Sequence, residues 1–299
     1  MFTRTLTERE EAMKTGLRKK LAASAAATSA LAALVVATPS AGHAAATPSL
    51  PAFGITDDGT RMAAFSTDDP GTLNWFRRIN GLVGDTAAIG IDFRVQNGLM
   101  YLVGNKGGIY TVKTPPAVPD PQVTKVSQLS VPLQGTNFGV DFNPAADRLR
   151  IISDTGQNLA HNLANGSTAT NTPLTTDGAS AHGVTAAAYT NNDLISDTAT
   201  TLFDLNTTTD QVVIQSPPAM GLLVGTGSLG QNAGANAGFD IFSDVSAGKT
   251  IANTAFATFF AGTDTSPSFY TVDVLTGATS FVDQFPANIT DIAVALDSN

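Results

Sequence analysis

The chain has 299 residues and a formal net charge of −9, and only 14% of its residues are charged. It is rich in Gly, Thr, Ala, Asn and Asp, which suits a turn-rich β protein and argues against helical bundles and coiled coils. It contains no cysteine, which excludes a disulfide framework, a thiol nucleophile and a zinc site with sulfur ligands.

The first 46 residues predict a secretory signal peptide. A basic cluster at 14–20 precedes an apolar, Ala-rich stretch at 21–37, and small residues lead to a cleavage point near Ala44 or Ala46. A membrane anchor is the alternative, but the stretch is short and weakly hydrophobic for a span. Three acidic residues precede Met13, which suggests Met13 as the natural start. We therefore expect residues 47–299 to be secreted, either to the extracellular space or to the periplasm.

The mature chain is expected to be strongly acidic. Removing residues 1–46 takes away six of the 16 basic and three of the 25 acidic side chains, which leaves a formal charge of about −12. Such a surface repels nucleic acid and anionic lipid. No apolar stretch near the C-terminus could insert the mature chain into a membrane. We expect a monomer whose partner is an extracellular ligand or a component of the cell envelope.

Related segments recur through the mature chain at a period near 50 residues. One begins with "IGIDFRVQNGLMYLVG", the next with "FGVDFNPAADRLRIISDTGQN", and further units follow with "AAAYTN", "AGFDIFSD" and "ITDIAVAL". Aligned on the acidic position, the anchors are Asp92, Asp141, Ala188, Asp240 and Asp291. A period near 50 with about four short strands per unit is typical of a β-propeller.

The strand pattern of one unit and of the chain ends predicts five blades. In the unit at 89, strands are expected at 89–93, 99–103, 108–112 and 123–129, separated by Asn-Gly, Lys-Gly and Pro-rich turns. The C-terminus offers one strand, 290–296, and the mature N-terminus offers three, at 52–55, 61–65 and 72–79. Together they would form a shared blade that closes the ring and leaves no long unpaired edge.

We therefore expect one all-β domain, a propeller of five four-stranded blades. A sixth blade would require further strands within 165–185 or 216–237. A β-sandwich is the alternative architecture, although it would not require a period near 50.

Four segments resemble a bacterial secreted family known only as a domain of unknown function (number 4394). They are "GIDFRVQNGLMYLVG", "GTNFGVDFNPAADRLRIISDTGQNL", "AAAYTN" and "FYTVDVLTGATSFV". The resemblance extends over about residues 50–296. It implies export and a propeller-like β architecture, and it implies no activity and no catalytic residues.

Two short motifs and a pair of histidines suggest known sites but lack the context that those sites need. "GTGSLG" at 225–230 is followed by a Gly/Asn loop where a nucleotide-binding helix would begin, so it predicts a strand end and turn. "DTG" at 154–156 occurs once, whereas aspartic proteases need two such triplets, so it predicts a turn. His161 and His182 are too few for a zinc site, and a catalytic role for His182 is weaker than a loop role.

The recurring aspartates are the main candidates for a site. The first strand of each propeller blade is the innermost, so Asp92, Asp141, Asp240 and Asp291 could form a ring of carboxylates on the axis and bind Ca²⁺. The structural interpretation is preferred over this cation site: each Asp accepts hydrogen bonds from backbone groups or from Arg94, Arg148 and Arg150.

A second set of candidates lies in the loops of the face that propellers commonly use for ligands. These loops include Asp154, Gln157, Asp177 and His182, together with Asp57, Asp58, Lys106, Asn232, Asn236 and Asp264. A sugar site would need an exposed aromatic platform. Trp75 and Tyr270 are the candidates, but both are expected within strands.

The sequence predicts a secreted binding or interaction module with an unknown ligand. The alternative is a Ca²⁺-dependent hydrolase or lactonase with its site on the channel or the top loops, and a structural envelope protein is a third hypothesis. Propellers host both binding and catalysis, so the fold alone does not choose.

Overall fold

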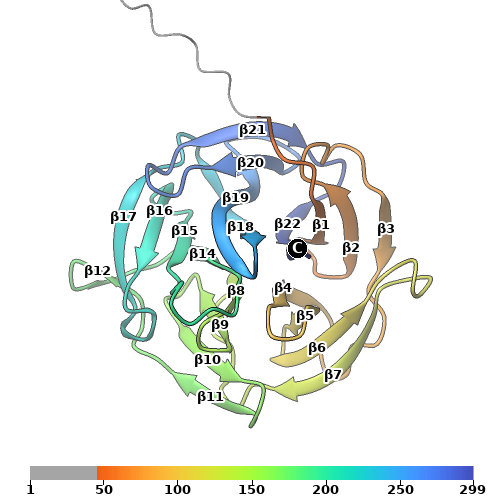
Figure 1. Cartoon of the computed structure of the whole chain (residues 1–299). Helices are drawn as coiled ribbons and strands as arrows, with labels where there is room; N and C mark the ends of the chain where they lie inside the picture. The colour runs from red at the N-terminus through yellow and green to blue at the C-terminus, as the bar shows by residue number, and fades with distance from the viewer. Residues whose placement is uncertain (1–45, 299) are drawn as a thin grey trace, which may run out of the picture. The chain divides into compact units, whose positions relative to one another are not determined.

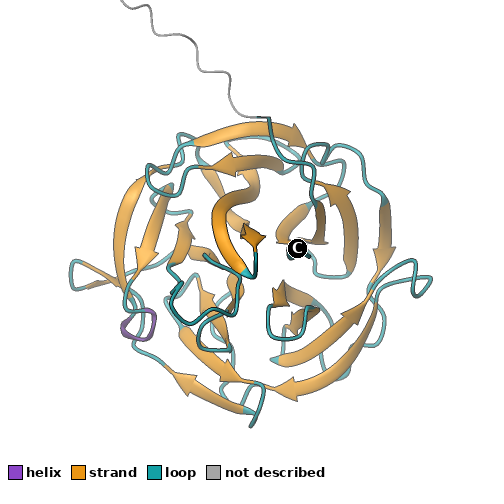
Figure 2. Cartoon of the chain, viewed as in Figure 1, coloured by secondary structure: helices purple, strands orange, loops and turns teal. Residues whose placement is uncertain are grey.

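The computed structural model describes residues 46–298. The predicted signal peptide, with its alternative start at Met13 and the cleavage point at Ala44, lies outside the described residues. Within residues 46–298, five antiparallel sheets are arranged around a common axis as the blades of a propeller (Figures 1 and 2). The predicted five-bladed architecture is confirmed.

The blades are numbered in chain order, and their strands are given from the axis outward. Blade 1 contains β22 (Ile289–Val294), β1 (Pro51–Thr56), β2 (Arg61–Ser66) and β3 (Trp75–Arg78). Blade 2 contains β4 (Ala88–Arg94), β5 (Leu99–Gly104), β6 (Gly108–Lys113) and β7 (Gln122–Gln128). Blade 3 contains β8 (Phe138–Asn143), β9 (Arg148–Ser153), β10 (Asn158–Asn162) and β11 (Ser167–Thr170).

The remaining two blades differ from this pattern in detail. Blade 4 contains β14 (Val184–Tyr189), β15 (Leu202–Asn206), β16 (Gln211–Gln215) and β17 (Leu222–Ser228), followed outward by β12 (Thr175–Thr176) and β13 (Ala179–Ser180). Blade 5 contains β18 (Ala233–Ser246), β19 (Lys249–Ala261), β20 (Ser268–Val272) and β21 (Thr279–Gln284).

Burial along the strands explains why the repeat is visible in the sequence. The innermost strands β14 and β22 are buried at every position, because each lies between two neighbouring blades. The outer strand β7 is mostly exposed. Innermost strands therefore form continuous apolar runs, whereas outer strands are polar and weakly marked.

The ring is closed as predicted, by the C-terminal strand. β22 pairs antiparallel with β1, with Ala52 opposite Val294 and Gly54 opposite Ile292. Phe65 of blade 1 contacts Phe269 of blade 5 edge-on, with 5.4 Å between ring centroids. Hydrogen bonds and apolar packing thus both hold the two ends of the ring together.

The long segments that left room for a sixth blade hold no additional blade. The segment 165–185 provides β11 to blade 3 and the short β12–β13 hairpin to the edge of blade 4, while 216–237 provides β17 and the start of β18. Blade 4 has its four expected strands, β14 to β17, and carries the hairpin outside them, where β12 pairs parallel with β17. No helix in the described part of the chain is long and apolar enough to cross a membrane.

Candidate cation site on the propeller axis

Carboxylates on the innermost strands join each blade to the next. An innermost strand has a neighbouring strand on one side only, so its N–H groups on the axis side need another acceptor. Asp92 of β4 accepts a hydrogen bond of 2.6 Å from the Phe142 N–H of blade 3 through Oδ2. Asp141 of β8 accepts one of 3.2 Å from the Tyr189 N–H of blade 4 through Oδ1. Backbone hydrogen bonding therefore gives the recurring acid a structural role.

The same contact corrects the alignment of the last repeat. Asp240 of β18 accepts a hydrogen bond of 2.5 Å from the Val294 N–H through Oδ2, which makes Val294 the counterpart of Phe142. The counterpart of Asp141 in blade 1 is therefore Ala293, and Asp291 lies two residues earlier on β22. The sequence alignment paired Asp291 with the wrong position because it matched residue type.

The packing of β22 confirms this register. Val294 packs in the core between blades 1 and 5, as Phe142 packs in the core between blades 3 and 2. Both side chains thus point back toward the preceding blade, so the residue before each points toward the following one. Three blades, and not four, have an acid at the equivalent position.

The two blades with alanine at this position are compensated by their neighbours. Ala188 of blade 4 and Ala293 of blade 1 have no carboxylate to offer to the next blade. There, Asp240 and Asp92 each use Oδ1 to accept a 2.6 Å hydrogen bond from the N–H of the residue that follows them. Asp92 and Asp240 thus use both oxygens on backbone groups. Asp141 uses only Oδ1, and within residues 46–298 no hydrogen bond is found to its Oδ2.

The three equivalent acids converge on the axis. Asp92, Asp141 and Asp240 are buried, and each offers a carboxylate oxygen within 4.8 Å of the other two. The pKa values of Asp92 and Asp141 lie well above the usual range. The main cause is burial, and the negative charges of the nearby carboxylates raise these pKa values further. Burial raises the pKa of Asp240 to about 6. Close carboxyl groups away from water favour either bound protons or a bound cation.

A pocket of about 290 Å³ lies on the axis at the N-terminal ends of the innermost strands. It reaches Asp291, whose Oδ2 accepts a 2.8 Å hydrogen bond from the Ile91 N–H and whose pKa is raised well above its usual range, mainly by burial. Two residues along a strand span about 7 Å, so the three-acid cluster lies one layer below Asp291. The pocket is lined by Ile55, Thr56, Asp57, Ala88, Ile89, Thr136, Asn137, Phe138, Asn236, Thr290 and Asp291.

The predicted loop residues are spread over several places. Asp154 accepts hydrogen bonds from the N–H groups of Thr136 and Asn137, at 3.0 and 3.3 Å, and so supports one wall of the pocket. The Gln157 side chain bonds the segment that joins blades 2 and 3: it accepts from the Gln134 N–H and donates to the Pro132 carbonyl, both at 2.9 Å. Asp177 lies exposed in the turn between β12 and β13, and His182 lies exposed between β13 and β14; neither lines the pocket.

Sequence reasoning missed the pocket residues Thr136, Asn137 and Thr290. Each lies just before or at the start of an innermost strand. This position relative to the repeat was the one sequence signal that could have placed them at the pocket. Asp57 and Asn236 were among the predicted loop residues, and the structure brings them together, with Asn236 Nδ2 donating to Asp57 Oδ1 at 2.9 Å.

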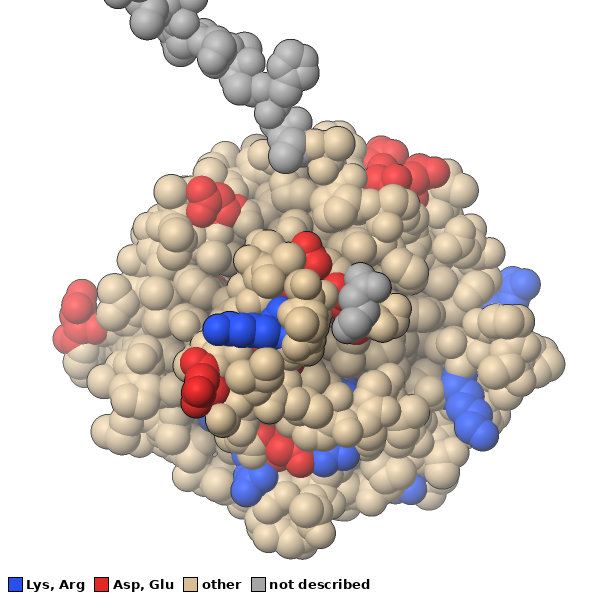
Figure 3. All heavy atoms as spheres, in the orientation of Figure 1, with Lys and Arg blue, Asp and Glu red and all other residues tan. Residues whose placement is uncertain are grey.

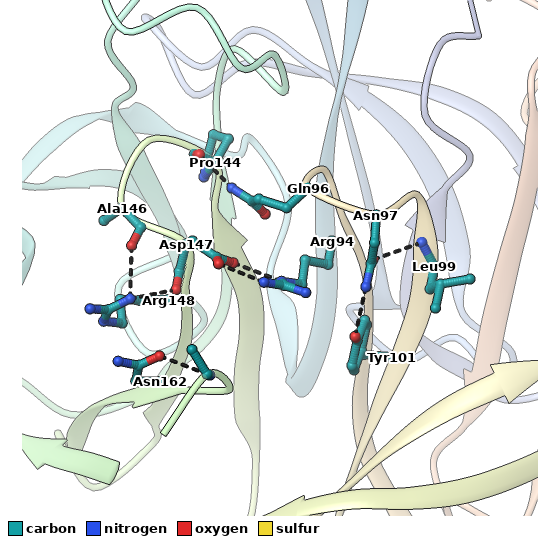
Figure 4. Close-up of polar contacts among 11 residues, drawn as sticks. Arg94, Gln96, Asn97, Leu99, Tyr101, Pro144, Ala146, Asp147, Arg148 and Asn162 are labelled. Carbon is teal, nitrogen blue, oxygen red and sulfur yellow. Dashed lines mark hydrogen bonds and ion pairs between the residues drawn. The ribbon is translucent and has the colours of Figure 1, made fainter. Parts of the chain in front are cut away.

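The arginines proposed as partners of the ring acids have other partners. Arg94 forms a bidentate ion pair with Asp147, at 2.7 and 2.5 Å, which joins blades 2 and 3 (Figure 4). Arg148 donates to the backbone oxygens of Ala146 and Asp147. The buried Arg150 donates to side-chain oxygens between blades 3 and 4, on Asn158, Asn171 and Tyr189.

The remaining motifs are structural in their observed contacts. "GTGSLG" ends β17, and "DTG" forms the turn between β9 and β10. His161 is buried, with Nε2 2.8 Å from Ser127 Oγ and Nδ1 3.0 Å from Thr168 Oγ1, and burial lowers its pKa. A neutral imidazole thus joins blades 2 and 3.

On the face drawn in Figure 3, charged side chains lie singly or in small groups among uncharged residues. This face lacks the continuous basic surface that a nucleic-acid partner would need.

Comparison with known proteins gives a family and distant folds. Residues 61–293 match the family described as "Domain of unknown function (DUF4394)". None of the curated proteins searched matches the chain. A Bacteroides thetaiotaomicron protein of unknown function is similar at a TM-score of 0.45 and 14% identity, over 85% of this chain and 68% of that one.

Two further solved structures are comparably distant. Glutaminyl cyclase from Myxococcus xanthus has a TM-score of 0.44 and 13% identity, over 76% of this chain and 97% of its own. The WD40 domain of Toxoplasma gondii coronin has a TM-score of 0.37 and 14% identity, over 76% of this chain and 55% of its own. Likenesses at this distance do not bear on what this chain binds or does.

Proposed function

We propose that this chain, which belongs to the family described as domain of unknown function DUF4394, is a secreted binding module that holds Ca²⁺ on its axis. The ion would be bound by Asp92, Asp141 and Asp240, and a small polar ligand would occupy the pocket above it. The observation that supports this proposal is the convergence of three buried carboxylates within 4.8 Å.

The spacing and chemistry of the three acids suit Ca²⁺. Oxygens that share one Ca²⁺ lie about 2.3–2.6 Å from the ion, so they lie at most about 5 Å from one another. Carboxylates are hard ligands that this ion prefers, and its positive charge offsets their mutual repulsion. Asp141 Oδ2 is the atom best placed to contribute, because Oδ1 alone is used on the backbone.

The pocket above the ion suits a small ligand with hydroxyl or amino groups. Its polar lining consists of carboxyl, amide and hydroxyl groups, which Asp291, Asn236 and Thr136 exemplify. Neither His161 nor His182 lines the pocket, so neither described histidine is placed to act there as a general base. Asp291 connects the two layers, since its charge acts on Asp92 and Asp141.

Thermal unfolding and titration calorimetry with Ca²⁺ test the ion. At a hundredfold excess over Kd, Ca²⁺ should stabilise the secreted chain by about 3 kcal/mol relative to EDTA. The double variant D141N/D240N should lose this response, while D244N, an exposed acid on the same strand, should keep it. An unchanged melting temperature together with no heat of Ca²⁺ binding would refute the proposal, and Ca²⁺-dependent turnover of a lactone would favour the hydrolase instead.

A further inference from the structure

We infer that a second binding site, for a neutral saccharide chain, lies on the rim between blades 4 and 5. A groove of about 530 Å³ opens there, where the segment that joins the two blades meets the β19–β20 loop. The site goes beyond the axis proposal and does not depend on it. The groove is lined by Gly230, Gln231, Asn232, Ala261, Gly262, Asp264, Ser268, Tyr270 and Phe281.

An exposed aromatic ring forms one wall of the groove. Phe281 on β21 is 61% exposed, although it is a large apolar side chain. Its ring lies 6.0 Å from that of Tyr270 at 73°, and Tyr270 is stacked on the buried Phe259 with 4.6 Å between centroids. The exposed ring therefore has a rigid aromatic base, which makes it a platform for the apolar face of a pyranose ring.

Polar groups around the ring can bind sugar hydroxyls. Gln231, Asn232 and Asp264 provide amide and carboxylate groups, and Ser268 adds a hydroxyl. The backbone at the groove is fixed, because the Gly262 N–H donates to the Asn232 carbonyl at 2.8 Å and the Asp264 N–H donates to the Ala261 carbonyl at 2.9 Å. The loops that carry these side chains are thus held by backbone hydrogen bonds.

The lining determines which sugars fit. None of its residues is Lys or Arg, so the groove has no cation to pair with a phosphate, sulfate or uronate group. Asp264 would repel such groups as well. A neutral saccharide is the ligand that the ring, the amides and the charge together favour.

The other aromatic candidate from the sequence does not form such a platform. Trp75 on β3 is half-buried and packs against Phe53, with 6.0 Å between ring centroids. It is therefore part of the apolar packing of blade 1.

Calorimetry and saturation-transfer NMR with neutral hexasaccharides of glucose, N-acetylglucosamine, mannose and xylose test this site. At least one should bind, and F281A should weaken its binding tenfold or more. I251A is the matched control, because Ile251 is a 66% exposed apolar residue of the same blade and does not line the groove. The two variants should melt alike, since both truncate exposed side chains.

Three further results separate this site from the axis site. D264N should weaken binding without loss of folding, D141N should leave it unchanged, and EDTA should leave it unchanged. The inference is overturned if none of the four hexasaccharides binds, or if F281A binds them as tightly as I251A does.

Discussion

Different polar contacts join neighbouring blades at two seams of the ring, the seam between blades 2 and 3 and the seam between blades 4 and 5. At the first, Asp92 binds the Phe142 N–H, and the Arg94–Asp147 ion pair adds a second link further out (Figure 4). At the second, Ala188 offers no carboxylate, and Asn192 instead donates to the Ile241 carbonyl at 3.1 Å and to Ser243 Oγ at 2.9 Å.

The comparison shows that the axial position of a seam in this chain does not require an acid, because Ala188 stands there in blade 4. Elsewhere in this seam, Asp193 and Asp210 of blade 4 accept hydrogen bonds of 2.8 Å from the Thr250 and Ala233 N–H groups of blade 5. An apolar core that includes Phe203, Phe239 and Phe259 also joins the two blades. Three buried acids on one axis are therefore more than the ring needs for closure, and their charge must be neutralised by protons or by a cation. This excess of negative charge favours the Ca²⁺ proposal.

Removal of the Asp92 carboxylate should have the largest effect on stability. D92A leaves the N–H groups of Phe93 and Phe142 without their acceptor, at about 1–3 kcal/mol for each group. We therefore expect a loss of about 3 kcal/mol from the two groups, in addition to the stabilisation lost with the Ca²⁺ that Asp92 is proposed to bind. N192A at the seam between blades 4 and 5 removes one side-chain hydrogen bond and should cost about 1 kcal/mol. Denaturant unfolding of both variants measures the difference, and equal losses would contradict the distinction between the two seams.

The period near 50 was enough to predict the fold, because the innermost strands are buried on both faces and therefore form apolar runs. A carboxylate ring on the axis was the less favoured interpretation of the four recurring acids, and the structure brings one carboxylate oxygen each of Asp92, Asp141 and Asp240 within 4.8 Å of one another. The place of Asp291 was not predictable from residue type. Its register follows from which side chains of β22 face blade 5, and that depends on packing across the ring closure.

The pocket and the groove were harder to predict than the strands. Their residues come from loops that join at the ends of different blades, such as Asn137 with Asn236, or Asn232 with Asp264. Such loops have no periodicity that could place them relative to one another. The β12–β13 hairpin was missed because strands of two residues are too short to leave an alternating pattern.

Stability should fall as the pH rises when no cation is present. The raised pKa values mean that the folded chain binds protons more tightly than the unfolded chain, so the stabilisation is complete below pH 4 and is lost as the pH passes about 6, where Asp240 ionises. The rise in the pKa of Asp240 from its ordinary value to about 6 corresponds to about 3 kcal/mol of stability for this residue alone. Denaturant unfolding in EDTA at pH 5 and pH 8 measures this change, and Ca²⁺ should restore the stability at pH 8.

The variant D240N isolates this effect from other titrations. Burial lowers the pKa of His161, so that residue changes stability in the opposite direction, with a loss as the pH falls. The difference between the wild-type chain and D240N removes the contribution of His161. Stability in EDTA that has the same pH dependence in both chains would contradict the assignment to the axis acids.

The ion pair between Arg94 and Asp147 should contribute least, although it is the most visible polar link of its seam. Both side chains are partly exposed, at 17% and 33%, so water and salt screen their attraction. The bidentate geometry still favours a measurable coupling of about 1 kcal/mol in a double-mutant cycle of R94A and D147A, and this coupling should decrease in 1 M NaCl. The Asp92 loss should not depend on salt, because its hydrogen bond to the Phe142 N–H is buried. The prediction is contradicted if the Arg94–Asp147 coupling energy exceeds the stability lost in D92A, or if the coupling does not change with salt. The exposed ion pair would then stabilise this seam more than the buried carboxylate of Asp92 does.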